Sequence, residues 1–552
     1  MKKMKPTWGM ASGLLLLIIC LTGLATVDHY GSSWDEQVRA EAGELKFDYY
    51  RNLLSGNFGQ ARDFAARADN YPGFHDLNLA ILKQCLPIRP ELAGHLFSLV
   101  LGILGIAGAM RLATLLAEGR AGFLTGLILS LTPSYYGHMF INPKDIPFAF
   151  GYVWSIYWIA RWIREGGSST PWKTVILTGT FIGVTTACRI GGLVLFCYLG
   201  LFLLLRIVME AHLGNEGIRK GILNGLRKTL LPVAAAVAIS MIILWLYWPA
   251  LHSNPFGKAS GTLARVTQFT WSMPVLFEGD YLAVDQLPWY YILKMLLIKI
   301  PAGYLAILAG GTFLFVRGFQ HQQPLERIRA HFPGIFISFS ILFPLFYVIA
   351  RDSTLYNGIR HLLFIVPPLA VAAGISLDKL LRMATASSVR NSRLAWAAVS
   401  VYFCLVGLSQ VRLHPYQYIY YNELAGGTAA ASRSYETDYW GTVYRELAEG
   451  LYAHLVTTRP AFSGPDVVIN MEHVTWLFEP YLPASRSLPL RITRSQPQSD
   501  DYYAASTAWA ADRYYHGTPV VVVERSGIIL GIVKDRRGLT LAERALGYEP
   551  AP

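Results

Sequence analysis

Charged residues are scarce in this chain of 552 residues. Only 15% are Asp, Glu, Lys or Arg, while 53% are apolar and 13% are aromatic. The mean hydropathy is +0.34. Soluble globular proteins carry about 25% charged residues, so this composition excludes an ordinary soluble protein of this length. It indicates a polytopic membrane protein.

Several motifs of known chemistry are missing as well. The chain has five cysteines and contains no C-x-x-C, no H-E-x-x-H and no P-loop. It therefore has no recognised motif for zinc binding, thiol redox chemistry or nucleotide-triphosphate binding. Cys20, Cys188, Cys197 and Cys404 lie in or at the ends of predicted spans, and only Cys85 lies in a predicted outer loop. No disulfide framework is therefore available.

What the chain does contain is a series of apolar runs. A helix needs about 17–25 apolar residues to cross the roughly 30 Å of membrane hydrocarbon. Eleven such spans are predicted, at 9–27, 93–115, 121–138, 145–163, 172–188, 190–208, 229–250, 288–316, 333–350, 359–379 and 394–411. The first follows Lys2, Lys3 and Lys5 but is long and lacks an A-x-A-like cleavage site, so we interpret it as a retained anchor. Small-residue pairs such as Gly122/Gly126 and Gly179/Gly183 favour close helix packing.

The orientation follows from the Lys and Arg residues of the short loops. With the N-terminus inside, all six inner segments carry such residues, at 2–5, 111–120, 161–173, 206–228, 317–329 and 379–393. The loop 28–92, the loop 251–287 and the tail 412–552 then lie outside, in the periplasm if the host is Gram-negative. The net charge of +12 is largely this inner bias, so we expect no nucleic-acid partner.

The tail differs from the rest of the chain. Short apolar runs at Val467–Asn470 and Leu490–Thr493 precede a plausible hairpin, in which Arg525-Ser526-Gly527 joins Pro519–Glu524 to Ile528–Val533. We expect two domains: a transmembrane domain over 1–411, and at 412–552 an aromatic connector, His414–Trp440, followed by a small extracytoplasmic α/β domain.

Ionisable side chains gather in the predicted outer loops. They stand at the ends of predicted spans, where an ionised group costs free energy unless it is paired or hydrated, so a converging set predicts a functional site. The candidates are Asp35 and Glu36, Lys144 and Asp145, Arg189, and finally Arg351, Asp352, Arg360 and His361.

The carboxylates also have structural interpretations. Ser33-x-x-Glu36 is typical of a capping box for a helix from about Trp34 to Leu54, in which Glu36 binds only the Ser33 amide. Asp35 would then lie in the first turn, where the helix dipole favours a carboxylate. Asp145 precedes a span and has a proline two residues later, which is typical of a helix start.

The cations have structural alternatives too. Arg189 could be a boundary residue that extends its charge to water, and the pair Arg360-His361 could be an interface anchor. Four other histidines are expected to form hydrogen bonds near the boundary rather than to bind metal: His29, His75, His95 and His138.

The order of these motifs resembles a known family. An N-terminal span followed by an acidic pair that opens an outer-loop helix, Trp34-Asp35-Glu36-Gln37-Val38-Arg39-Ala40-Glu41, is similar to the signature of GT-C membrane glycosyltransferases, in particular family 39. That family includes protein O-mannosyltransferases and the lipid A aminoarabinose transferase. Asn142-Pro143-Lys144-Asp145 stands where the second acidic motif is expected, and the resemblance extends over roughly residues 10–410.

The resemblance implies a GT-C fold and a polyprenyl-phosphate sugar as donor. It also implies that no divalent metal is obligatory, although the carboxylates could bind one. The segments 421–427 and 438–441 are similar to runs in bacterial members, without an assigned role. Where the aminoarabinose transferase has a lysine-glycine pair, this chain has Arg189-Ile190-Gly191-Gly192, which keeps a cation and leaves the sugar open.

The chemistry of transfer from a lipid phosphate suits these residue types. An acceptor hydroxyl must lose its proton as it attacks C1, while negative charge grows on the departing phosphate. Asp35 is the candidate base, Asp145 orients the acceptor or shares that task, and Glu36 is the third acidic candidate. The phosphate would be bound by cations, because arginine offers a bidentate fork: Lys144, Arg189, Arg351, Arg360 and His361. Attack opposite the leaving group inverts the anomeric carbon.

Two other classes of function remain open. A transporter of an anionic or lipid-linked substrate would place ionisable groups near the middle of the membrane and often shows inverted repeats; the sequence has no clear repeat, and its charges cluster at the outer boundary. A membrane scaffold with a partner-binding tail would not need acidic and basic outer loops to converge. For an enzyme, the acceptor could be a protein, a lipid or a glycan.

Overall fold

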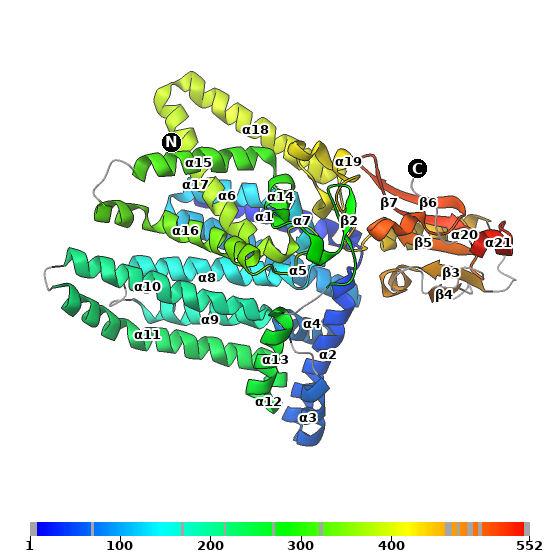
Figure 1. Cartoon of the computed structure of the whole chain (residues 1–552), viewed down its shortest axis with the longest axis horizontal. Coiled ribbons are helices and arrows are strands. Elements are labelled where there is room, and N and C mark those ends of the chain that lie inside the picture. The colour runs from blue at the N-terminus through cyan, green and yellow to red at the C-terminus, as the bar shows by residue number, and fades with distance from the viewer. Residues whose placement is uncertain are drawn as a thin grey trace, which may run out of the picture.

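A bundle of long helices forms most of the molecule, and a small sheet domain stands at one end of it (Figure 1). The computed structural model of the chain describes residues 8–67, 71–166, 170–214, 217–267, 271–319, 324–458, 466–471, 475–482, 490–494 and 499–545. The fold class predicted from the sequence, a helical polytopic membrane protein with a small C-terminal domain of strands and helices, is confirmed.

The bundle has helices at the positions of the eleven predicted spans, but not all of them qualify as spans by length and composition. Its helices are α1 (Trp8–Thr26), α5 (Pro90–Leu116), α6 (Gly119–Ser130), α7 (Pro133–Ile141), α8 (Asp145–Glu165), α9 (Trp172–Cys188), α10 (Val194–Leu213), α11 (Ile218–Tyr247), α14 (Tyr291–Lys299), α15 (Ala302–Phe319), α16 (Pro324–Ala350), α17 (Val366–Ser387) and α18 (Val389–Arg412). Among the described residues, seven helices are long and apolar enough to cross a membrane, or eight if a bent pair counts as one span.

Two of the predicted spans are broken rather than continuous. The span predicted at 288–316 is the bent pair α14 and α15, whose axes differ by 109°. The span predicted at 121–138 is divided between α6 and α7. Each second helix follows or begins with a proline, Pro301 or Pro133, and a proline disfavours helical geometry in the residue before it. Apolar composition alone did not reveal these breaks.

Small residues bring neighbouring helices into close contact, as predicted. A Cβ added to Gly179 of α9 would lie 2.6 Å from the Ala236 carbonyl of α11, and one added to Gly183 would lie 2.9 Å from Cα of Ser240. On α6, a Cβ at Gly126 would lie 2.6 Å from the sulfur of Met110. Because the neighbours of Gly179 and Gly183 include backbone atoms, glycine is required for the spacing of α9 and α11, whereas the Met110 side chain beside Gly126 is flexible.

Shorter helices lie at the end of the bundle that faces the sheet domain. In Figure 1, α2 and α3 run across the long helices rather than along them. The elements of this region are α2 (Trp34–Leu54), α3 (Phe58–Arg67), α4 (Phe74–Cys85), α12 (Ala250–Ser253), α13 (Pro255–Thr267), and the hairpin of β1 (Val275–Phe277) and β2 (Asp280–Leu282).

The C-terminal domain is built around a five-stranded mixed sheet of order β4-β3-β5-β7-β6. Its strands are β3 (Val467–Met471), β4 (Leu490–Arg494), β5 (Tyr502–Ser506), β6 (Thr518–Arg525) and β7 (Ile528–Asp535), and its helices are α20 (Tyr444–Thr458) and α21 (Leu541–Ala545). The connector before it contains α19 (Gly427–Ala431). The predicted hairpin is the antiparallel pair β6 and β7. Its two turn residues, Ser526 and Gly527, have φ angles of 52° and 79°, as a tight hairpin turn requires.

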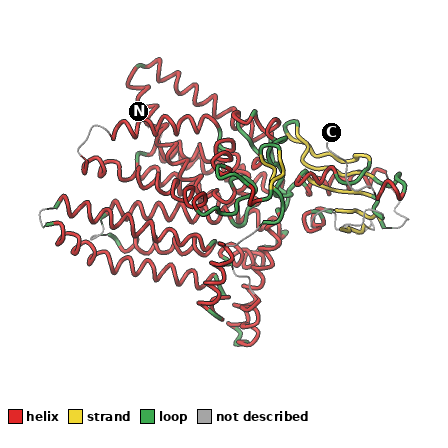
Figure 2. The backbone as a smooth tube through the Cα atoms, in the orientation of Figure 1, coloured by secondary structure: helices red, strands yellow, loops and turns green. Residues whose placement is uncertain are grey.

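Loops concentrate between the bundle and the sheet domain (Figure 2). They include the segment before α2, the segment between α7 and α8, the segment after α16 and the aromatic connector after α18. Functional residues often lie on loops that a rigid scaffold positions, so a site is expected at this junction.

Candidate active site

The start of α2 is fixed by the predicted capping box. Glu36 Oε1 accepts hydrogen bonds from the Ser33 amide at 3.1 Å and from Ser33 Oγ at 3.0 Å. Its other carboxylate oxygen lies 3.1 Å from Nε2 of His95 on α5. The predicted capping box is therefore present, but Glu36 contacts His95 as well as the Ser33 amide, and Asp35 next to it forms other contacts.

The residues before α2 are clamped on two further sides. Ser33 Oγ donates to the Ile141 carbonyl at the end of α7 at 2.7 Å. The Ser32 amide donates to the hydroxyl of Tyr481, in the C-terminal domain, at 2.7 Å. Gly31 lies so close to the segment before α20 that an added Cβ would be 2.2 Å from the Thr442 carbonyl. The C-terminal domain thus helps to position Asp35.

The second acidic motif forms a compact turn into α8. Asn142 Oδ1 accepts from the amides of Lys144 at 3.1 Å and Asp145 at 2.8 Å, a local pattern that favours asparagine. Asn142 Nδ2 donates to Asp145 Oδ2 at 2.8 Å. Asp145 is the first residue of α8 rather than its cap, so its side chain is free to contact other elements.

Asp35 lies between two cations. Lys144 Nζ donates to its Oδ1 at 3.1 Å, and Arg360 Nη2 donates to its Oδ2 at 3.0 Å. The Arg360 guanidinium also stacks on the ring of Trp440, with 4.3 Å between its central carbon and the ring centroid. The connector, which had no role from the sequence, therefore supplies an aromatic support for Arg360.

Asp145 is paired with two arginines. Arg189 Nη2, at the end of α9, forms an ion pair with Asp145 Oδ1, and Arg360 Nε lies 3.6 Å from Asp145 Oδ2. Arg360 thus bridges Asp35 and Asp145. The Arg360 side chain is buried in these contacts, whereas 26% of the Arg189 side chain is exposed.

The two cations govern the ionisation of Asp35. Burial by itself opposes a charged carboxylate, but Lys144 and Arg360 outweigh it and hold the pKa of Asp35 well below its usual range. Burial lowers the pKa of Lys144, and Asp35 partly offsets this effect. Asp35 is therefore ionised at neutral pH while both cations contact it.

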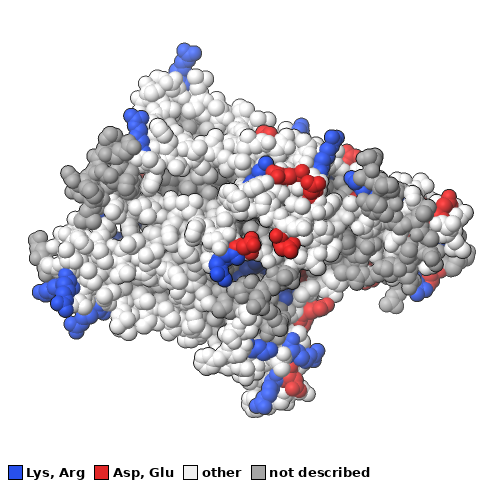
Figure 3. Space-filling view, viewed as in Figure 1, with Lys and Arg blue, Asp and Glu red and all other residues white. Residues whose placement is uncertain are grey.

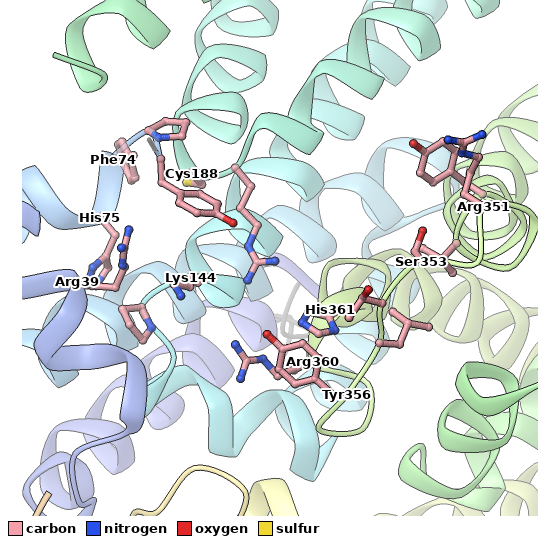
Figure 4. A pocket seen from close by; sticks show the side chains of 18 of the residues that line it. Arg39, Phe74, His75, Lys144, Cys188, Arg351, Ser353, Tyr356, Arg360 and His361 are labelled. Atoms are coloured by element: carbon pink, nitrogen blue, oxygen red, sulfur yellow. The ribbon is translucent and has the colours of Figure 1, made fainter. Parts of the chain in front are cut away.

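A cavity of about 410 Å³ opens directly over these cations. Its walls come from α2, α4, the turn before α8, the end of α9 and the segment after α16. The cations that line it are Arg39, Lys144, Arg189, Arg351 and Arg360. Figure 4 shows Lys144 and Arg39 on one side of this space, Arg360 and His361 on another, and Arg351 farther out. Two carboxylates, Asp76 and Asp352, line it as well. The five Lys and Arg side chains outnumber them, so the cavity is suited to an anion.

His361 lies beside Arg360 in the cavity wall. Its ring packs edge-on against Tyr356, with 4.5 Å between the centroids. Its Nδ1 is buried and has no hydrogen-bond partner among the described residues. A buried ring nitrogen without a partner is costly, so this atom is available to a ligand.

The sequence did not identify one further group of charges, part of which lines the cavity: Arg39 and Asp76. Arg39 of α2 and Lys46, about two turns further along, both contact Asp76 Oδ2 of α4, at 3.2 Å and 3.1 Å. Lys46 is fully buried. The sequence showed two basic residues on one face of α2 and an aspartate in the segment that forms α4, but no local pattern indicates that they contact one another.

A second cavity, of about 260 Å³, lies along another face of α2. Glu36, Glu41 and Glu44 line it, and it shares His75 and Pro143 with the first cavity. The four histidines predicted to be hydrogen-bonded all have a partner: His29 with His414, His75 with Ser98, His95 with Glu36 and His138 with the Ser134 carbonyl.

Metal ligands do not gather at this site. Across the described part of the chain, no three His, Cys, Asp or Glu side chains are grouped so that they could hold a metal ion. The carboxylates of Asp35 and Asp145 are instead neutralised by Lys144, Arg189 and Arg360.

Part of the chain matches a known family. Residues 82–226 match the family model described as dolichyl-phosphate-mannose-protein mannosyltransferase. This segment contains the second acidic motif with Asp145 and the cation Arg189. The match confirms the predicted resemblance to GT-C membrane glycosyltransferases over these residues. A comparison with curated proteins gives no match.

Several solved structures are similar to this chain along most of its length. ArnT from Cupriavidus metallidurans in the apo state has a TM-score of 0.48 and 13% identity, with 98% of each chain covered. The same protein bound to undecaprenyl phosphate has a TM-score of 0.47 and 13% identity, covering 94% of this chain and 97% of that one. The apo oligosaccharyltransferase of Archaeoglobus fulgidus has a TM-score of 0.45 and 11% identity, covering 96% and 75%. At such scores, the chemistry of the site rests on its own geometry.

Proposed function

We propose that this chain is an inverting glycosyltransferase that moves a sugar from a polyprenyl-phosphate donor to an acceptor hydroxyl. The reaction would take place on the extracytoplasmic face of a bacterial inner membrane. Residues 1–411 would form the catalytic domain, and 412–552 the connector and an outer domain that steadies the start of α2.

One observation carries this proposal: a cavity lined by cations stands over two carboxylates that those same cations neutralise. Lys144 and Arg360 contact Asp35, and Arg189 contacts Asp145. A phosphate entering the cavity would meet the cations first. The match of residues 82–226 to a family whose description names a lipid-phosphate sugar supports the choice of donor.

The reaction assigned to these residues is a single displacement. The acceptor oxygen forms a bond to C1 of the sugar, and the bond from C1 to the phosphate oxygen breaks. The acceptor proton passes to Asp35, and the negative charge that develops on the leaving phosphate is stabilised by Lys144, Arg360 and Arg189. The products are the glycosylated acceptor and a polyprenyl phosphate.

The low pKa of Asp35 determines when this residue can act as a base. A carboxylate whose pKa lies far below neutral accepts a proton weakly. A donor phosphate competes with Asp35 for Lys144 and Arg360. When either cation contacts the phosphate instead of Asp35, the pKa of Asp35 rises. Donor binding would therefore activate the base.

The second cavity offers a separate path for the acceptor. Inversion requires the acceptor and the leaving phosphate to be on opposite faces of the sugar. Two cavities that lie along different faces of α2 and share His75 and Pro143 fit this requirement. We assign the cationic cavity to the donor and the cavity lined by Glu36, Glu41 and Glu44 to the acceptor.

The distribution of basic residues supports the proposed sidedness. Figure 3 shows Lys and Arg side chains at the ends of long helices remote from the C-terminal domain, where few acidic side chains are visible. Positive residues favour the cytoplasmic side of a membrane. The candidate site and the C-terminal domain would then be extracytoplasmic.

The proposal is tested by turnover of a defined donor. Purified protein in detergent would be mixed with a polyprenyl-phosphate sugar and an envelope extract as acceptor, and release of polyprenyl phosphate would be followed by chromatography. We expect release that depends on Asp35. The proposal fails if a panel of mannose, glucose and aminoarabinose donors gives no release while the donors bind, because the site would then hold lipid phosphates without transferring sugar.

A further inference from the structure

A third cavity lies at the opposite end of the bundle from the candidate active site. It has a volume of about 550 Å³ and lies between the ends of α5, α8 and α10 and the start of α16. The candidate active site contains the start of α8 and the residues after α16, so the two cavities occupy opposite ends of the same helices. Figure 1 places the left ends of α10 and α16 far from the C-terminal domain.

Charge in this cavity is strongly unbalanced. Three arginines line it, Arg164, Arg206 and Arg329, with a single acidic residue, Glu210. Glu210 is engaged by Arg206, whose Nη2 lies 2.7 Å from its Oε1. Arg164 Nη1 donates to the Leu115 carbonyl, a neutral group. The cavity therefore carries an excess of positive charge.

The remaining walls are apolar. They include Ile163 of α8, Leu213 of α10, and Phe332 and Phe336 of α16. Leu213 is 43% exposed, whereas Phe336 is only 1% exposed, so the wall extends from the interior to the outer surface of the bundle. A ligand that fills this space must combine an anionic group with a hydrocarbon part.

The position of the cavity selects the ligand. The helices α5, α10 and α16 contain segments long and apolar enough to cross a membrane, so their ends lie near its surface. Arginine presents a planar fork that matches phosphate oxygens, and basic pockets between transmembrane helices bind anionic lipid headgroups. A phospholipid of the bilayer brings both a phosphate and acyl chains to this level.

We propose that this cavity is a binding site for an anionic phospholipid. Its phosphate lies among Arg164, Arg206 and Arg329, and an acyl chain lies along Leu213 and Phe332. Bound lipid would join the end of α8 and α10 to the start of α16. The site is independent of the proposed glycosyl transfer, since it shares no residue with the cationic cavity at the other end.

The test compares lipids on the full-length protein. Purified protein would be loaded with phosphatidylglycerol or phosphatidylcholine, and retained lipid would be counted by native mass spectrometry. We expect wild type to retain phosphatidylglycerol selectively, and Arg164→Gln/Arg329→Gln to bind it about tenfold more weakly or worse. The matched control is Arg219→Gln/Lys220→Gln on α11, which removes the same charge at exposed positions outside the cavity lining.

Three outcomes would overturn the proposal. One is equal retention of phosphatidylcholine by wild type, and another is an equal loss of phosphatidylglycerol in the control, which would indicate a general charge effect. The third is full displacement of phosphatidylglycerol by inorganic phosphate at matched concentration, which would indicate a phosphate site without lipid. If the double variant does not fold, Arg329→Gln alone gives the same comparison, because Arg329 is exposed.

Discussion

The guanidinium of Arg360 donates a hydrogen bond to Asp35, with 3.0 Å between Nη2 and Oδ2. The two residues are 325 positions apart in the chain. The bond joins the first turn of α2 to the segment between α16 and α17. In the proposed reaction the same guanidinium also binds the donor phosphate, so its effect on donor binding and its effect on the base can be measured separately.

Replacing Arg360 should weaken donor binding. Arg360→Ala removes a hydrogen-bond donor to a charged group, which contributes about 1.5–3 kcal/mol. The Kd for a polyprenyl-phosphate sugar should therefore rise about 10- to 150-fold. Binding would be measured by calorimetry, with Arg537→Ala in the C-terminal domain as the control arginine variant.

Arg360→Lys keeps the charge but not the planar fork, and it should fall between wild type and Arg360→Ala. If Arg360→Ala folds and leaves both donor affinity and turnover unchanged, Arg360 and His361 are interface anchors rather than phosphate ligands.

Removing Lys144 should shift the pH dependence of turnover. A base acts in its deprotonated form, so the acid limb of kcat/KM follows the pKa of Asp35 in the free enzyme. Lys144 and Arg360 hold that pKa below the ordinary aspartate value of about 3.9, so wild type should lose no activity through Asp35 as pH falls toward about 4. In Lys144→Met one of the two cations is gone, and the limb should move to higher pH.

The control for this shift is Lys294→Met, which breaks a half-exposed pair with Glu278 away from the cavity. If the acid limb is identical in wild type and Lys144→Met, Lys144 does not lower the pKa of the catalytic base.

A methyl group at Gly31 should disturb the start of α2. In Gly31→Ala the new Cβ would meet the Thr442 carbonyl at 2.2 Å, so the backbone that carries Asp35 must shift. We expect a lower melting temperature and lower kcat. Gly59→Ala in α3 is the matched control, because nothing lies within 4 Å of its Cβ. Equal behaviour of the two variants would show that the clamp from the C-terminal domain does not position Asp35.

The proposed sidedness can be tested by cysteine labelling. In a background without the five native cysteines, Ser526→Cys in the β6–β7 turn should react with an impermeant thiol reagent added to spheroplasts. Ser387→Cys, at the end of α17, should react only after lysis. Protection of Ser526→Cys in intact spheroplasts would contradict an outer C-terminal domain.

The sequence singled out charged residues that the structure brings together, but it did not predict their contacts. Ion pairs join Asp35, Lys144, Asp145, Arg189 and Arg360. Which cation contacts which carboxylate could not be predicted, since those contacts join distant segments and depend on how the helix ends are staggered.

Other elements gave little local signal. β5, with the sequence Tyr502-Tyr503-Ala504-Ala505-Ser506, lacks β-branched residues and was not predicted, although it joins the two halves of the sheet. Trp440 and Tyr481 act on Arg360 and Ser32 from the far end of the chain. Their roles follow from tertiary packing, which no local pattern encodes.

The most direct test of the proposed mechanism compares Asp35→Asn with Glu36→Gln in the same assay of polyprenyl-phosphate release. Asp35→Asn removes the proton acceptor and frees Lys144 and Arg360, so the donor should bind at least as tightly while turnover falls by roughly 10²–10⁴. Glu36→Gln preserves the capping box but changes a residue that lines the second cavity, so its turnover should fall much less than that of Asp35→Asn. A well-folded Asp35→Asn enzyme with a near-normal rate would contradict the assignment of Asp35 as the base.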